Sequence, residues 1–248
     1  MSTEVAGTRT ALVLGATGAV GKALLKDVLK NGGYKKVITL GRRPAQLDES
    51  IPQNNLEQKT IDFDNLEASR AEFRNVNDVF CCLGTTRADA GSAEAFRRID
   101  QYYVVNSAKI IAEENKPEST TTTKLSPVHF LYCSSGGSNK NSPFLYPQSK
   151  GQTEESIIQA GFERVSIFQP GFLEVEQPRE KSRLAEATLG VLLAPISHFL
   201  NLHLSISVVS VGEAMRKVAL EHVPSASASV ETKVEYYSNK YMEALAQN

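Results

Sequence analysis

A tyrosine and a lysine four residues apart, Tyr146 and Lys150, have the types and spacing of an acid/base pair. Pro147 favours the first turn of a helix, and side chains at positions i and i+4 lie on the same helix face. A nearby ammonium favours the phenolate form of a tyrosine, whose hydroxyl is otherwise a poor acid at neutral pH. The spacing therefore predicts that Tyr146 donates or accepts a proton and that Lys150 assists it.

Two serines precede this pair in the chain. Ser134 and Ser135 follow a run of β-type residues, Val128 to Cys133, and ligands of open α/β sheets bind at the carboxyl ends of the strands. Either hydroxyl could hold a substrate carbonyl oxygen. Ser135 is the predicted catalytic serine, with Ser134 as the alternative.

A glycine-rich turn lies near the start of the chain, between a strand-like and a helix-like segment. Glycine allows a tight turn, close approach of the backbone to a pyrophosphate, and close packing of helix on strand. The helix N-terminus then offers free N–H groups to the phosphates. A turn that binds nothing is the alternative. The residues of this turn predicted to bind a dinucleotide are Gly15, Thr17, Gly18, Ala19, Val20 and Gly21.

Two arginines follow the second predicted strand, where an acidic residue would favour the ribose 2′-hydroxyl of NAD. Arg42 and Arg43 could instead bind a 2′-phosphate through charge-assisted, forked hydrogen bonds, which predicts NADP(H). Simple solvation of the two side chains is the alternative. Asp62 and Phe63, at the end of the third predicted strand, are expected to bracket the adenine, although an acidic residue there is often a helix cap.

Short β-type runs alternate with helical patterns, which predicts βαβ units and a Rossmann-like α/β fold: a doubly wound parallel sheet with helices on both faces. The predicted strands are residues 10–14, 36–40, 56–63, 78–83, 128–133 and 164–169. The predicted helices are residues 20–29, 66–73, 93–114, 146–160 and 211–221.

The whole chain, 1–248, is predicted to form one dinucleotide-binding domain. Its expected parts are a cofactor-binding core (10–170), substrate-side loops and helices (171–222) and a C-terminal extension (223–248). Residues 116–126, with four consecutive threonines, predict a solvated insertion. In the extension, the spacing of four apolar residues predicts an amphipathic helix. These residues are Val234, Tyr237, Tyr241 and Leu245.

The composition of the chain disfavours several classes of function. With 27 Lys+Arg against 28 Asp+Glu, the net charge of −1 gives no basic excess for nucleic-acid binding. The three cysteines form neither a disulfide framework nor a zinc set, which favours a reducing intracellular compartment and buried, unreactive thiols. No metal site is expected, because His198 and His203 are five apart and His129 lies in a buried-type strand.

The N-terminal residues show neither a signal nor a transit peptide. The most apolar window, 188–211, is interrupted by polar residues and proline, so it predicts a buried or interfacial helix rather than a membrane span. Attachment to a membrane surface through residues 189–204 is a further hypothesis.

The glycine turn, Ser135, Tyr146 and Lys150 together resemble the atypical or extended short-chain dehydrogenase/reductase superfamily. More narrowly, residues 81–87, 144–151 and 169–171 resemble the Tat-interacting-protein-30-like oxidoreductases and their fungal relatives associated with the mitochondrial outer membrane. The resemblance covers roughly residues 10 to 222. This sequence departs from the family pattern at Gln169, where arginine is usual, and in the threonine-rich insertion and the C-terminal extension.

The resemblance implies further roles. Leu83, Gly84 and Thr85 would line the cofactor, and the segment containing Pro170, Gly171 and Leu173 would wrap the nicotinamide end. It also implies that Lys150 holds the nicotinamide ribose and that Tyr146 contacts the cofactor. Hydride transfer to or from a carbonyl or alcohol would follow.

The sequence thus predicts an NADP(H)-dependent oxidoreductase that acts on a small carbonyl or alcohol. The alternative is a regulatory protein that senses NADPH and binds a protein partner, because a fold does not fix a function. The expected location is the cytoplasm, with the surface of the mitochondrial outer membrane implied by the resemblance. No motif names the substrate or the oligomeric state.

Overall fold

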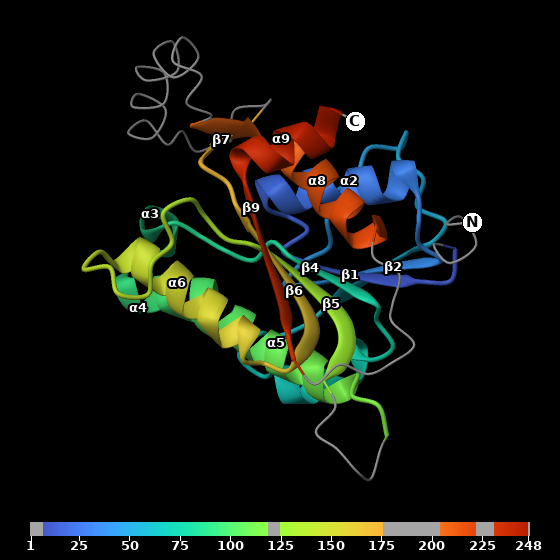
Figure 1. The fold of residues 1–248 in the computed structure, drawn as a ribbon. Helices are drawn as coiled ribbons and strands as arrows, with labels where there is room; N and C mark the ends of the chain where they lie inside the picture. The colour runs from blue at the N-terminus through green and yellow to red at the C-terminus, as the bar shows by residue number, and fades with distance from the viewer. Residues whose placement is uncertain (1–6, 119–124, 176–203, 222–230, 248) are drawn as a thin grey trace.

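In the computed structural model, which describes residues 7–118, 125–175, 204–221 and 231–247, seven parallel strands form one twisted sheet (Figure 1). Their order is β3-β2-β1-β4-β5-β6-β9, and β7 pairs with β8 in a separate two-stranded sheet. The strands are β1 (Thr10–Leu14), β2 (Lys36–Gly41), β3 (Leu56–Thr60), β4 (Asp78–Cys81), β5 (Ser126–Cys133), β6 (Phe162–Gln169), β7 (Phe172–Glu174), β8 (Ser205–Ser207) and β9 (Lys233–Ser238).

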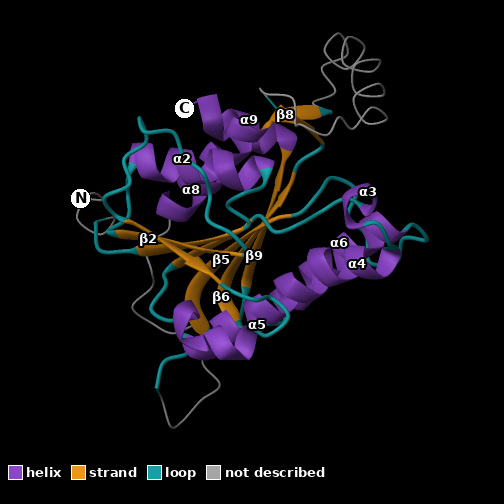
Figure 2. Cartoon of the chain, turned by 180° about the vertical axis from the view of Figure 1, so that it is seen from behind, coloured by secondary structure: helices purple, strands orange, loops and turns teal. Residues whose placement is uncertain are grey.

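Helices cover both faces of the sheet, as Figure 2 shows. One face packs against α2 (Ala19–Asn31), α8 (Val208–Glu221) and α9 (Asn239–Gln247). On the other face lie a 3-10 helix (Leu66–Phe73), α5 (Tyr103–Glu114) and α6 (Leu145–Ile158). Two short helices, α3 (Arg87–Ala90) and α4 (Ala93–Arg97), and a π-helical turn (Arg98–Tyr102) lead into α5. The predicted doubly wound parallel fold is confirmed.

The alternation of side chains along the buried strands produces two separate cores. In β1, Ala11 and Val13 belong to the core beneath α2 and α8, whereas Leu12 and Leu14 belong to the core beneath α5. All four are fully buried, as expected for a strand covered on both faces. Because β1 pairs in parallel with both β2 and β4, the carboxyl ends of the three strands lie at one edge of the sheet, where the glycine turn and the arginines begin.

The predicted C-terminal helix is wrong for its first half. Val234 and Tyr237 lie in β9, which pairs in parallel with β6, and only the residues from Asn239 onward form a helix. The spacing of these residues does fit a helix, but the free edge of β6 offers hydrogen bonds that a strand from elsewhere in the chain satisfies. Arg164 of β6 is ion-paired with Glu235 of β9, and the rings of Phe168 and Tyr237 stack with centroids 4.7 Å apart.

Other predicted elements differ in their bounds. The third strand ends at Thr60 rather than at residue 63. The fourth strand ends at Cys81 rather than at residue 83, because the chain turns into a loop that faces the cavity described below. The single helix predicted over residues 93–114 is interrupted by the π-helical turn. Part of the threonine-rich insertion (119–124) and most of the apolar window (188–203) lie outside the described residues, so their predictions are untested. Among the described residues, no helix is long and apolar enough to cross a membrane.

Candidate active site

The glycine turn joins β1 to α2 in a conformation that requires glycine. Gly15 has a φ of +82°, and a Cβ on it would lie 2.5 Å from the carbonyl oxygen of Cys82. A Cβ on Gly21 would overlap the carbonyl oxygen of Gly15. Gly18 caps α2 without a side-chain hydrogen bond, so the first N–H groups of this 13-residue helix are open to a ligand.

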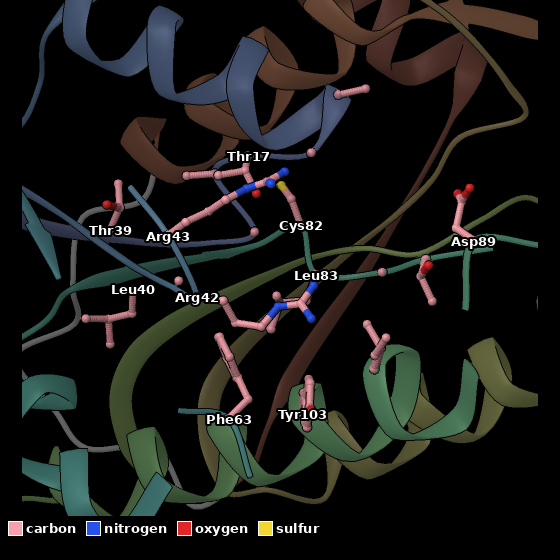
Figure 3. Close-up of a pocket in the computed structure, with 18 residues that line it drawn as sticks. Thr17, Thr39, Leu40, Arg42, Arg43, Phe63, Cys82, Leu83, Asp89 and Tyr103 are labelled. Atoms are coloured by element: carbon pink, nitrogen blue, oxygen red, sulfur yellow. The ribbon is translucent and has the colours of Figure 1, made fainter. Parts of the chain in front are cut away.

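A cavity of about 590 Å³ opens at this turn, at the carboxyl ends of β1, β2 and β4 (Figure 3). This is the switch point of the sheet, because the chain proceeds from β1 to β2 and β3 in one direction and from β4 onward in the other. The lining residues are Gly15, Ala16, Thr17, Gly18, Ala19, Thr39, Leu40, Gly41, Arg42, Arg43, Phe63, Cys82, Leu83, Gly84, Thr85, Asp89, Ile99 and Tyr103.

Most residues predicted to bind the cofactor line this cavity, but several do not. Val20 and Gly21 are buried in the helix, and Asp62 accepts a hydrogen bond from the N–H of Asp64 in a local turn. Outside the cavity lining lie Val20, Gly21, Asp62, Tyr146, Lys150, Pro170, Gly171 and Leu173. Ile99 and Tyr103 were not predicted to bind the cofactor, although both lie on the helix predicted over residues 93–114. The other lining residues that were not predicted are Ala16, Thr39, Leu40, Gly41, Cys82 and Asp89.

Aromatic rings and cations gather beside the end of β2 in the cavity. The rings of Phe63 and Tyr103 stack with centroids 5.2 Å apart. Asp64 accepts hydrogen bonds from the Tyr103 hydroxyl and from Arg98, at 2.9 Å and 2.7 Å, and the bond from Arg98 is the main cause that lowers the pKa of Asp64. Arg98 is thereby neutralised by a local carboxylate.

Arg42 and Arg43 differ from Arg98, because both are exposed and neither forms an ion pair within the described parts of the chain. Figure 3 shows both side chains extending over the cavity from the end of β2. Two guanidinium groups that lack a carboxylate partner and border a cavity suit a ligand that carries an anionic group.

The reactive pair predicted on α6 is arranged differently from the expectation. Tyr146 is 42% exposed and its ring contacts that of Phe96, with centroids 5.8 Å apart. Lys150 is buried, and its ammonium donates a hydrogen bond to the Tyr132 hydroxyl (3.2 Å) and lies 3.1 Å from Asp100 Oδ1. The described structure thus has no hydrogen bond between Lys150 and Tyr146, which interact through charge over a longer range.

Ser134 and Ser135 follow β5 and are both buried, but their partners differ. Ser134 Oγ donates a hydrogen bond to Glu154, a buried residue of α6 that also accepts one from Gln169 Nε2 at 3.1 Å. Ser135 Oγ lies 3.3 Å from Ser138 Oγ, whose hydroxyl donates to the backbone carbonyl of Ser135. Glu154 therefore engages the hydroxyl hydrogen of Ser134, whereas the hydroxyl hydrogen of Ser135 has no such strong acceptor.

The Pro170–Gly171 segment lies beside the serine loop. The N–H of Gly136 donates to the carbonyl oxygen of Pro170, and the N–H of Gly171 donates to Asn239 Oδ1 at 2.8 Å. A Cβ on Gly171 would overlap the carbonyl oxygen of Leu204. Leu173, on β7, is exposed. The segment that follows β6, the start of α9 and the residue before β8 thus meet beside the serine loop.

Cys81, Cys133 and His129 are core residues in the structure, whereas Cys82 is only partly buried and lines the cavity. Burial raises the pKa of the Cys81 thiol to about 12 and that of the Cys133 thiol to about 11, which makes both unreactive as nucleophiles. His129 is buried, with Nε2 2.8 Å from Ser166 Oγ. Over the described ranges no three side chains of the metal-binding types come together, and His198 and His203 lie outside them.

Comparisons with known proteins agree with this geometry. A family model described as NAD(P)H-binding matches residues 15–197. Protein HTATIP2 of Rattus norvegicus is 37% identical over 178 residues, which cover 72% of this chain and 67% of that protein. The mitochondrial protein FMP52-2 of Scheffersomyces stipitis is 31% identical over 239 residues, covering 95% of this chain and 97% of that protein.

Solved structures of enzymes share the fold. A short-chain dehydrogenase/reductase of Saccharomyces cerevisiae superposes with a TM-score of 0.64 at 14% identity, covering 97% of this chain and 99% of that one. The Bordetella bronchiseptica enzyme WbmF, in complex with NAD+, gives a TM-score of 0.63 at 14% identity, with 98% and 78% covered. The motifs, the switch-point cavity and these matches lead to one assignment. The chain belongs to the NAD(P)H-binding family and is related to the HTATIP2 and FMP52 proteins.

Proposed function

We propose that this protein is an NADP(H)-dependent oxidoreductase of the short-chain dehydrogenase/reductase type that acts on a small carbonyl compound or alcohol. One observation carries the proposal: Gly84, in the wall of the nucleotide cavity, lies against Lys150 of helix α6. This residue lines the cavity, and a Cβ on it would lie 3.4 Å from Lys150 Nζ. A dinucleotide placed along the cavity would therefore extend toward Lys150 and Tyr146.

The cavity fits a dinucleotide in shape and in charge. Gly15 and Gly18 leave room for a pyrophosphate against the open N-terminus of α2, and the stacked rings of Phe63 and Tyr103 suit an adenine. Arg42 and Arg43 would bind the 2′-phosphate that distinguishes NADP(H) from NAD(H). The bound nicotinamide would supply the site that donates or accepts a hydride.

The chain's own residues would orient the substrate and move the proton. In the reductive direction, Tyr146 Oη would give its proton to the carbonyl oxygen of the substrate, and in the oxidative direction it would accept the hydroxyl proton of the alcohol. Lys150, held as an ammonium, would stabilise the phenolate that remains after reduction and bind the nicotinamide ribose. Ser135 would donate a hydrogen bond to the substrate oxygen.

The test of the proposed function is a titration of purified protein with NADPH and with NADH, followed by nucleotide fluorescence. The chain has no tryptophan that would interfere. We expect NADPH to bind at least about tenfold more tightly, since a charge-assisted hydrogen bond contributes about 1.5–3 kcal/mol. Equal affinities would contradict the assignment of Arg42 and Arg43. Absence of binding by both nucleotides would overturn the proposal.

The structure favours Ser135 over Ser134 as the catalytic serine, because Glu154 already accepts the hydroxyl hydrogen of Ser134. We expect Ser135→Ala to lower kcat/KM for the carbonyl substrate about tenfold or more. Ser134→Ala, the matched control, should change it less than about threefold, since that hydroxyl would not reach the substrate. A larger loss in Ser134→Ala than in Ser135→Ala, at equal NADPH affinity, would reverse the assignment.

A further inference from the structure

Asp100 is a fully buried carboxylate that the sequence analysis did not single out. It lies in the π-helical turn (Arg98–Tyr102) that joins α4 to α5, and its Oδ1 is 3.1 Å from Lys150 Nζ. Single π-helical turns within α-helices occur frequently at functional sites. Here the turn brings a charged side chain against the reactive helix α6.

The contacts of Asp100 connect Lys150 to the cavity wall. Asp100 Oδ1 also accepts a hydrogen bond from the N–H of Thr85, at 3.3 Å. A Cβ on Gly84 would lie 3.1 Å from the same oxygen and 3.4 Å from Lys150 Nζ. Gly84 and Thr85 both line the cavity, so the Asp100–Lys150 pair lies directly behind the wall of the nucleotide site.

The donors of Lys150 explain why this placement matters. An ammonium has three N–H bonds, and the described residues accept two of them, Tyr132 through its hydroxyl and Asp100 through Oδ1. Together these two acceptors fix the position of Nζ, so that its third N–H bond points in one direction and can donate to a ligand there. Asp100 Oδ2 accepts no hydrogen bond from any described residue, although it is buried.

We propose that Asp100 is a positioning residue, which holds the ammonium of Lys150 behind Gly84 and keeps it charged for its work on the ribose and on Tyr146. This inference rests on the proposed function, because it gives Lys150 a role in the reaction. It assigns no contact between Asp100 and the substrate.

The surroundings of Lys150 show why a counter-charge is needed. The ionisable groups facing it are Tyr132 and Cys133 of β5, Cys81 of β4, Cys82 of the following loop, Tyr146 of α6 and Asp100. Burial keeps the three thiols and the Tyr132 hydroxyl neutral by raising their pKa values. Asp100 is therefore the carboxylate in this set, and an unpaired buried ammonium would be costly.

The competing explanation is that Asp100 merely stabilises the fold as half of a buried ion pair. Asp78 provides a matched control, because it is equally buried and is ion-paired with Arg9 at the opposite end of the sheet, at the start of β4. Asp78→Asn and Asp100→Asn each remove one buried carboxyl group without changing side-chain size. Only the second removes it beside Lys150.

The experiment measures NADPH affinity, kcat, KM and the pH dependence of carbonyl reduction for wild type and both variants. Burial lowers the pKa of a lysine that has no counter-charge, so Lys150 in Asp100→Asn should lose its proton at lower pH. We expect the alkaline limb of the kcat profile to move at least about one pH unit lower, with kcat reduced more than KM is raised. Asp78→Asn should keep the alkaline limb of the kcat profile at its wild-type pH, even if the substitution lowers the stability of the fold.

A wild-type alkaline limb in an active Asp100→Asn protein would overturn the proposal. If wild type bound no NADPH, the proposed function would fail instead, so the two failures are distinguishable. A second measurement uses the wild-type protein, so it does not depend on the folding of an Asp100 variant. The 13Cε NMR signal of Lys150, assigned by comparison with Lys150→Arg, should remain that of an ammonium up to pH 10. A titration of this signal near pH 8 in wild type would contradict the role of Asp100.

Discussion

Replacing Tyr146 by phenylalanine is expected to lower kcat for carbonyl reduction about 100- to 10 000-fold, the usual contribution of a positioned acid or base. The substitution removes only the hydroxyl, and the ring can keep its contact with Phe96. NADPH affinity should stay within about threefold of wild type, because Tyr146 does not line the nucleotide cavity. Fluorescence titration and steady-state kinetics on the same preparations measure both quantities.

Tyr241→Phe is the matched control for this prediction. Tyr241 lies on α9, is 66% exposed and loses the same hydroxyl. Its turnover should equal that of wild type. A Tyr146→Phe protein that binds NADPH normally and retains full turnover would show that another group moves the proton.

The second large effect is expected from the double substitution of Arg42 and Arg43 by alanine. Loss of two charge-assisted interactions with the 2′-phosphate, at about 1.5–3 kcal/mol each, should weaken NADPH binding about 100-fold or more. NADH, which lacks that phosphate, should bind within about threefold of its wild-type affinity. The variant would therefore lose the preference for NADPH. In the wild type this preference should decrease with rising salt, and the variant should show no such salt dependence.

Arg74→Ala controls for the loss of surface charge. Arg74 is exposed and is ion-paired with Glu114, away from the cavity. The substitution should leave both nucleotide affinities unchanged. If the Arg42/Arg43 variant weakened NADH and NADPH binding equally, the two arginines would be acting on the shared part of the nucleotides rather than on the 2′-phosphate.

The parts of the site that the sequence predicted are those whose signal is local. The glycine turn and the two arginines each follow a buried strand directly, so a strand prediction places them at the carboxyl edge of the sheet. The cavity lining includes Gly15, Gly18, Arg42 and Arg43 as expected. Leu83, Gly84 and Thr85 were placed by resemblance, and they line it too.

The parts that were missed depend on partners far away in the chain. The spacing of Tyr146 and Lys150 indicates a shared helix face but cannot show that the ammonium turns toward Asp100, 50 residues earlier. Nothing in the local sequence marks Glu154, because its partners Ser134 and Gln169 lie 20 and 15 residues away in the chain. The strand β9 was hidden for the same reason, because its helical spacing was real and only the free edge of β6 selects the strand.

The hydrogen bond from Gly171 to Asn239 joins residues 68 positions apart. On a ribosome that adds about 5–20 residues per second, Asn239 is made roughly 3 to 14 seconds after Gly171. Throughout this interval the glycine turn, the arginines, Asp100 and Lys150 have already been synthesised, whereas β9 and α9 have not. A newly made chain therefore contains every residue that lines the cavity before it contains β9 and the helix whose Asn239 holds Gly171.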